Sequence, residues 1–126
     1  MPHLKIEYTG NLEPEGRFDL LCRSLAATMA GLSDPAGKPV FPLAGTRVLA
    51  YPAPFHAVGD GAPGQAFIYM NLRVTPGRTP AVLEAAGTAM LATVRSHFAA
   101  MTLSPTFAVT LHIDEITPAF EGRYRP

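Results

Sequence analysis

Hydrophobic and polar residues alternate along this chain at two periods, one typical of strands and the other of helices. Near the amino terminus, Leu4, Ile6 and Tyr8 alternate with Lys5 and Glu7. A period of two places successive side chains on opposite faces of an extended strand. The pattern therefore predicts a first strand that begins almost at the terminus and buries one face.

Two longer stretches have the period of an amphipathic helix. The first runs from Glu15 to Gly31, a residue that commonly ends helices. The second begins at Thr79 and Pro80, which supply an N-cap and a first-turn proline, and continues to about Ala100. The apolar positions of the first helix are Phe18, Leu21, Cys22, Leu25 and Met29, and those of the second, which also holds His97, are Leu83, Met90, Val94 and Met101.

Three further strands are predicted from short runs rich in β-branched and aromatic residues. They cover residues 47–51, closed by Pro52, then 66–74, followed by Pro76 and Gly77, and finally 107–113. The chain has 11 glycines and 13 prolines, and 12 of these residues lie between Gly31 and Gly64. We therefore expect this stretch to be rich in loops.

The predicted elements follow the order strand, helix, strand, and this order occurs twice. The dipeptide Gly16-Arg17 before the first helix is echoed by Gly77-Arg78 before the second. We therefore predict one domain over residues 1–126, made of two pseudo-repeats at about 2–60 and 61–120. The fold class is α+β, with two βαβ units forming one four-stranded mixed sheet and both helices on one face.

The sheet face without helices also needs cover. Tyr8, Phe67, Tyr69 and the methionine and leucine positions of the strands are too apolar for a fully solvated surface. We therefore expect the chain to associate with copies of itself, which would also cover the edges of the sheet.

Composition and charge exclude several classes of function. The 126 residues include ten basic and ten acidic side chains, without a basic cluster interleaved with aromatic residues, so we expect no nucleic-acid partner. No run of 18 apolar residues and no signal-like segment is present, which favours a cytoplasmic protein without a membrane partner. The four histidines lack paired ligand spacing and the one cysteine has no partner, so we expect no metal and no cofactor.

Pro2 is the residue whose position suggests chemistry. Removal of Met1 would leave Pro2 with a secondary amine, whereas a retained Met1 would make this nitrogen an unreactive amide. An α-amino group has a pKa of about 7.7 to 8.0, and neighbouring cations and burial lower it towards the range of a general base at neutral pH. From position alone, the favoured interpretation is structural, namely that Pro2 is simply the first residue of an edge strand.

Four segments carry a resemblance to a known family. They are residues 2–7 (PHLKIE), 41–47 (FPLAGTR), the Gly77-Arg78 turn and 96–100 (SHFAA). The chain resembles the 5-carboxymethyl-2-hydroxymuconate Δ-isomerase family of the tautomerase superfamily over nearly its whole length. The resemblance implies a cofactor-independent keto-enol isomerase of an aromatic-degradation pathway that forms a homotrimer.

By this resemblance, Pro2 is the catalytic base that moves a proton between oxygen and carbon of a dienol. Arg47 and Arg78 match family arginines that bind the carboxylates of a di- or tricarboxylate substrate, and guanidinium groups suit that task. Without the resemblance, Arg47 would be interpreted as a salt-bridge partner and Arg78 as an exposed loop residue. Arg73 is a weaker candidate that we expect at the surface.

Other chemically interesting side chains are assigned to the structure and not to the site. We expect His97 to be a hydrogen-bonded packing residue and Cys22 to be buried among apolar groups. His3 follows Pro2 but its side chain is predicted on the opposite sheet face. The pair Asp114-Glu115 is expected to be solvated at a strand end.

Two features leave the substrate open. The segments 33–39 and 50–64 depart from the family pattern and are expected to line or cover the pocket. The same base could serve another unsaturated 2-oxo acid, although the dehalogenases and decarboxylases of the superfamily would need further acidic or cationic groups. A different class of function also stays open, namely a catalytically silent trimeric interaction protein of the same fold.

Overall fold

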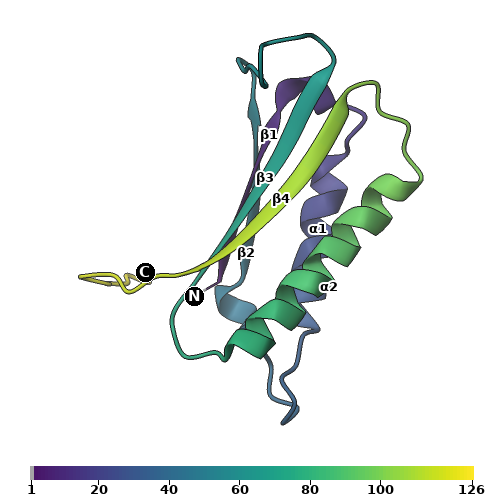
Figure 1. The fold of residues 1–126 in the computed structure, drawn as a ribbon. Coiled ribbons are helices and arrows are strands. Elements are labelled where there is room, and N and C mark those ends of the chain that lie inside the picture. Colours follow the sequence, from purple (N-terminus) through teal and green to yellow (C-terminus); the bar gives the residue numbers. More distant parts are fainter. Residues whose placement is uncertain (1) are drawn as a thin grey trace.

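The computed structural model describes residues 2–126 and has two layers, a sheet and a pair of helices (Figure 1). The strands are β1 (His3–Thr9), β2 (Arg47–Ala53), β3 (Gln65–Val74) and β4 (Thr106–Glu115), and the helices are α1 (Phe18–Ala30) and α2 (Pro80–Ala99). Two short 3-10 helices, η1 (Gly10–Leu12) and η2 (Leu43–Gly45), lie in the connections. Figure 1 shows α1 and α2 side by side on the same face of the sheet.

The four strands have the order β2-β1-β3-β4. β1 and β2 are parallel, as are β3 and β4, whereas the two central strands β1 and β3 are antiparallel. Each βαβ unit thus supplies one parallel pair, and the two units join through their first strands. The predicted fold, a four-stranded mixed sheet with two helices on one face, is confirmed.

Several element boundaries differ from the sequence prediction by a few residues. β2 continues through Pro52 to Ala53, although we expected Pro52 to close it. β2 is an edge strand that pairs only with β1, so one side of its backbone forms no ladder and a residue without an N–H is tolerated there. α1 begins at Phe18 and not near Glu15, because residues 12–17 form a tight turn closed by the Gly16 N–H on the Leu12 carbonyl at 2.8 Å.

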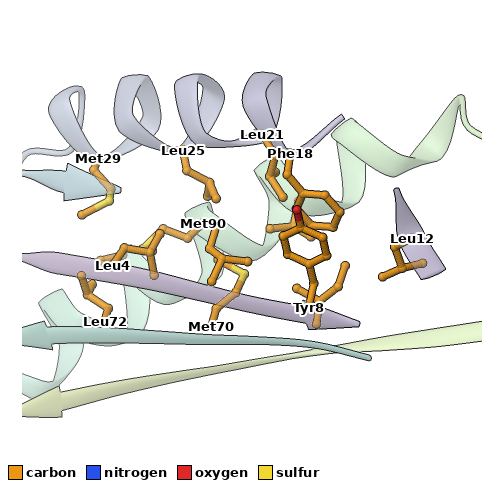
Figure 2. Close-up of a cluster of buried hydrophobic side chains, with 14 of the residues drawn as sticks. Leu4, Tyr8, Leu12, Phe18, Leu21, Leu25, Met29, Met70, Leu72 and Met90 are labelled. Atoms are coloured by element: carbon orange, nitrogen blue, oxygen red, sulfur yellow. The ribbon is translucent and has the colours of Figure 1, made fainter. Parts of the chain in front are cut away.

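The core lies between the helices and the facing side of the sheet (Figure 2). Every second residue of the central strands is buried there, against the apolar stripe of each helix. Figure 2 shows Leu21 and Leu25 of α1 above Leu4 of β1 and Met70 of β3, and all four are completely buried. The buried residues predicted from the strand and helix periods therefore pack together in one hydrophobic layer.

Tyr8 belongs to this core, which corrects our prediction that it lies on the helix-free face. It has the same parity in β1 as Leu4 and Ile6 and is only 2% exposed. Its ring stacks on Phe18 of α1 with 3.5 Å between ring centroids. The methionine and leucine positions of β3 are likewise under the helices, whereas Phe67 is 36% exposed on the other face.

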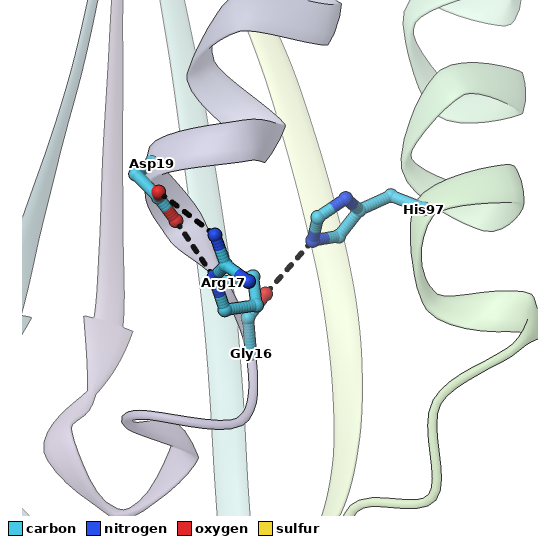
Figure 3. A network of polar contacts seen from close by, with 4 residues as sticks. All are labelled: Gly16, Arg17, Asp19 and His97. Atoms are coloured by element: carbon cyan, nitrogen blue, oxygen red, sulfur yellow. Dashed lines mark hydrogen bonds and ion pairs between the residues drawn. The ribbon is translucent and has the colours of Figure 1, made fainter.

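A polar contact joins α2 to the turn before α1 (Figure 3). The His97 ring nitrogen Nε2 lies 2.8 Å from the Gly16 carbonyl oxygen, and the His97 ring packs edge-on against Phe98. Next to Gly16, Arg17 adopts a left-handed backbone conformation with φ 48° and pairs with Asp19 at 3.2 Å. His97 is therefore the hydrogen-bonded packing residue that we expected.

Candidate active site

Pro2 and Arg47 lie beside each other at one end of the sheet. β1 and β2 are parallel and start together, with His3 opposite Arg47. The backbone N–H of Arg47 donates to the Pro2 carbonyl at 3.2 Å, so this contact extends the ladder by one residue. Pro2 is buried, whereas Arg47 is exposed. The structure thus brings together two of the three residues predicted for the site.

A row of polar and charged residues crosses the sheet at this end. In register, His3 of β1 lies between Arg47 of β2 and Arg73 of β3, and Arg73 is opposite Asp114 of β4. Leu4, Leu72 and every second residue along β1 and β3 from them are buried under the helices. The row has the opposite parity and therefore faces away from the helices. The side chain of His3 is on the face that the sequence predicted.

The row opens into a cavity of about 790 Å³. One wall comes from the first and last residues of the strands, and another from residues 117–126, which we call the C-terminal arm. Figure 1 shows this arm extending beyond the end of the sheet, near the amino terminus. The lining comprises His3, Pro42, Ala44, Gly45, Arg47, Arg73, Val74, Thr75 and Ile116, together with Pro118 and residues 120–125 of the arm. We call this space the amino-terminal cavity.

The amino-terminal cavity is electropositive although the chain as a whole carries no formal net charge. Among residues 2–126, four arginines contribute to its lining, two from strands and two from the C-terminal arm, and Glu121 is an acidic counterpart. Glu121 pairs with Arg123 of the same arm at 2.8 Å. An excess of guanidinium groups in a concave site attracts multiply charged anions.

Arg78 does not belong to the lining of this cavity, although it is hydrogen-bonded to the lining residue Thr75. Its Nε donates to the Val40 carbonyl at 2.9 Å, and its Nη1 donates to the Thr75 carbonyl at 3.2 Å. Its guanidinium carbon is 5.1 Å from the centroid of the buried Phe41 ring. Arg78 thereby fastens the loop before Pro42 to the end of β3, and its role in binding substrate stays a prediction.

From the sequence we missed the C-terminal arm and named Arg73 only as a weaker candidate, yet both contribute to the cavity. Arg73 is exposed, as expected, yet it lines the cavity because its strand partner is His3. The strand alternation already placed Arg73 on the helix-free face, but only the pairing of β1 with β3 brings it beside the Pro2 end. The arm follows the last strand and has no periodic pattern that would have indicated its position.

The remaining candidates agree with their structural assignments. Cys22 is half-buried, and this burial raises the pKa of its thiol, which keeps it in the unreactive protonated form. Asp114 accepts a hydrogen bond from the Asn71 side-chain amide at 2.6 Å. Within residues 2–126, no group of three or more His, Cys, Asp and Glu side chains could hold a metal ion.

A second hollow of about 540 Å³ lies at the other end of β1. Tyr8, Glu13 and Cys22 contribute to it, and the Tyr8 hydroxyl donates to the Glu13 carboxylate. Burial and this carboxylate together raise the pKa of Tyr8. The Tyr8 phenol therefore stays protonated and hydrogen-bonded to Glu13, which favours a structural role for these residues.

The segments 33–39 and 50–64 do not contribute to the amino-terminal cavity of this single chain. Residues 33–39 form a small hairpin in which the Asp34 carboxylate accepts from the backbone N–H groups of Ala36 and Lys38, each at 2.9 Å. Ser33 and Pro39 pair across its base. The role of the segments 33–39 and 50–64 in lining or covering the pocket stays a prediction.

Comparison with known proteins identifies the family. The family model of 5-carboxymethyl-2-hydroxymuconate isomerase matches residues 2–125. The chain belongs to this family. The family resemblance predicted from the sequence is thereby confirmed, and the chain is an isomerase. Membership gives no support to a catalytically silent assembly protein.

Individual family members match over nearly the whole chain. A 5-carboxymethyl-2-hydroxymuconate Delta-isomerase of Escherichia coli is 28% identical over 118 residues, which cover 94% of this chain and 89% of the relative. The crystal structure of another such Delta-isomerase superposes with a TM-score of 0.92 at 36% identity, covering 99% and 89% of the two chains. A family member from Deinococcus radiodurans R1 gives 0.81 at 32% identity, covering 99% and 90%.

More distant structures share the fold alone. A fused 4-OT wild type symmetric trimer superposes with a TM-score of 0.62 at 21% identity, covering 96% of this chain and 90% of that chain.

Among the described residues, no helix is both long and apolar enough to cross a membrane.

Proposed function

We propose that this isomerase converts 5-carboxymethyl-2-hydroxymuconate, or a related unsaturated 2-oxo acid, from its dienol to its keto form with the Pro2 amine as general base. The observation that carries the proposal is the placement of Pro2 at the start of β1, beside a cavity lined by arginines. The relatives named after this substrate support the choice of substrate class. The residue that would otherwise precede Pro2, Met1, lies outside the described residues.

The reaction is a proton transfer that needs no cofactor. Once Met1 is removed, the unprotonated Pro2 amine takes the proton of the substrate's 2-hydroxyl group and returns it to the far carbon of the conjugated system. The hydroxyl becomes a ketone, one double bond is lost and the other moves, so that atoms and charge balance. Cationic groups near an amine disfavour its protonated form, so the arginines of the amino-terminal cavity would help to keep Pro2 available as a base.

Arg47 is proposed as the group that holds the carboxylate next to the reacting hydroxyl. Its backbone is bonded to that of Pro2, so it is the lining arginine tied most directly to the base. A guanidinium binds a carboxylate through two parallel hydrogen bonds and stabilises negative charge on the adjacent oxygen as the enolate forms. Arg78 is proposed to act with it, through the loop and strand end that it fastens.

The experiment is an ultraviolet-monitored ketonisation assay of protein whose amino terminus has been verified by mass. We expect wild type to ketonise 5-carboxymethyl-2-hydroxymuconate, and Arg47→Ala to lower kcat/KM by about 10- to 100-fold, as the loss of a charge-assisted hydrogen-bonded pair predicts. Arg95→Ala, which removes an exposed arginine of α2, is the control of equal charge. Absence of turnover by wild type protein lacking Met1 would contradict the proposal.

We also propose that the isomerase works as a homotrimer. Tyr51 is 49% exposed and Phe67 36% exposed on the helix-free face, where a solvated sheet would carry polar residues. Proteins of the same fold include symmetric trimers. Light scattering at micromolar concentration is expected to give three times the protomer mass of 13.4 kDa, and a monomer would refute the assembly.

A further inference from the structure

Arg47 and Arg73 form a pair of cations on either side of β1. Both are register partners of His3, one on β2 and the other on β3. Adjacent strands are about 4.8 Å apart, so the two backbones are separated by roughly 10 Å. Long guanidinium side chains that start at this distance can bind two carboxylates of one extended molecule.

The two side chains open into the same space. Arg47 and Arg73 have the parity of His3, opposite to that of the buried Leu4 and Leu72, and all three line the amino-terminal cavity. They are therefore on the helix-free side of the sheet, next to the start of β1.

Among the described residues, Arg73 has no acidic ion-pair partner. Asp114 is its register partner on β4, but the Asp114 carboxylate instead accepts the Asn71 amide at 2.6 Å. Among residues 2–126, no ion pair joins Arg73 to an acidic side chain, although it is exposed to the cavity. An exposed guanidinium at the wall of a concave site is a binding group for an anion that comes from solution.

We propose that Arg73 binds the substrate carboxylate remote from the reacting hydroxyl and so selects substrates with two or more carboxylates. The inference rests on the proposed function, because it takes Pro2 as the base that defines the near end of the substrate. Arg47 is bonded through its backbone to Pro2, whereas Arg73 lies on the strand at the other side of β1. An extended conjugated dicarboxylate that has its hydroxyl at Pro2 thus places its far end towards β3.

The test compares two substrates that differ at the far end. 5-Carboxymethyl-2-hydroxymuconate has remote carboxylates, whereas 2-hydroxypenta-2,4-dienoate has only the one beside its hydroxyl. We expect Arg73→Ala to raise KM for the first about 10- to 100-fold with kcat changed less than about threefold, and to leave both constants for the second within about twofold. Arg73→Lys, which keeps the charge, should restore part of the affinity, and Arg95→Ala is the control.

The possible results separate the failure of this inference from that of the proposed function. If wild type is active and Arg73→Ala matches it on both substrates, or raises KM equally for both, the role of Arg73 is refuted while the proposed function stands. If wild type is active on neither substrate, the proposed function fails, and calorimetric binding of cis,cis-muconate decides about Arg73. Weaker muconate binding by Arg73→Ala and Arg73→Gln than by wild type would support the carboxylate site, whereas equal or absent binding would overturn it.

Discussion

Isomerisation by a chain whose Pro2 nitrogen is part of a peptide bond is expected to be about 10²- to 10⁴-fold slower than by a chain that begins at Pro2, the range that a positioned general base contributes. An amide nitrogen has no basic lone pair, so it cannot accept the proton of the substrate hydroxyl. The arginines of the amino-terminal cavity would still bind the carboxylates. The loss should therefore fall on kcat much more than on KM.

Two preparations of the same sequence make this comparison. One has Met1 fully removed, and the other retains it, with both masses verified and both proteins assayed on 5-carboxymethyl-2-hydroxymuconate. Pro2→Ala is a further control, because its processed form keeps an amino-terminal amine but loses the proline ring. Equal kcat values for the preparations with and without Met1 would exclude the Pro2 amine as the base.

Leu25→Ala is expected to destabilise the protein by about 2–5 kcal/mol, the usual range for removing a buried leucine side chain. Leu25 is completely buried in the layer between α1 and the sheet. Its truncation removes contacts with the surrounding side chains and leaves a cavity that the packed core cannot fill. The free energy of unfolding is measured by urea denaturation at one fixed protomer concentration, because association would otherwise contribute.

Leu20→Ala is the matched control in the same helix. Leu20 is 37% exposed, so its truncation removes less buried surface and leaves no enclosed cavity. We expect the midpoint of its unfolding curve to move much less than that of Leu25→Ala. If the two variants lost similar amounts of unfolding free energy, the helix face assigned to the core would be wrong.

The sequence predicts the fold well because each element has a local signal. The N-cap at Thr79 is an example, since its side chain accepts the Val82 backbone N–H at 3.3 Å as the pattern indicated. Tyr8 shows where the interpretation failed. Its parity with Leu4 and Ile6 already placed it under the helices, but we grouped it with the apolar residues of the helix-free face. In the core, its hydroxyl group donates to the Glu13 carboxylate.

The repeated Gly-Arg dipeptide shows why a local echo does not fix the role of a residue. A Cβ at Gly16 would lie 2.8 Å from the Leu12 carbonyl oxygen, whereas Gly77 is needed for its backbone φ of 129°. Their arginines differ too, since Arg17 pairs with the exposed Asp19 while Arg78 bonds two backbone carbonyls. The Gly-Arg dipeptide thus serves different structural purposes before α1 and before α2.

The candidate site was harder to predict because it depends on contacts between distant parts of the chain. Pro2 and Arg47 could be chosen from a resemblance to known sequences, and the parallel pairing of β1 and β2 places them together. Arg73 enters the site only through the antiparallel pairing of β1 with β3, which no local pattern specifies. The C-terminal arm depends on the path of the chain beyond β4, which has no periodic signal.

The start of β1 and the C-terminal arm contribute to the same cavity (Figure 1). Neighbouring ends usually make a fold suitable for circular permutation, in which a linker joins them and new ends are cut elsewhere. Here a linker would place the Pro2 nitrogen in a peptide bond. A permutant cut in the exposed loop between β2 and β3 should therefore fold while losing its proposed base. We therefore expect the fold to tolerate a change in chain order that the proposed chemistry does not.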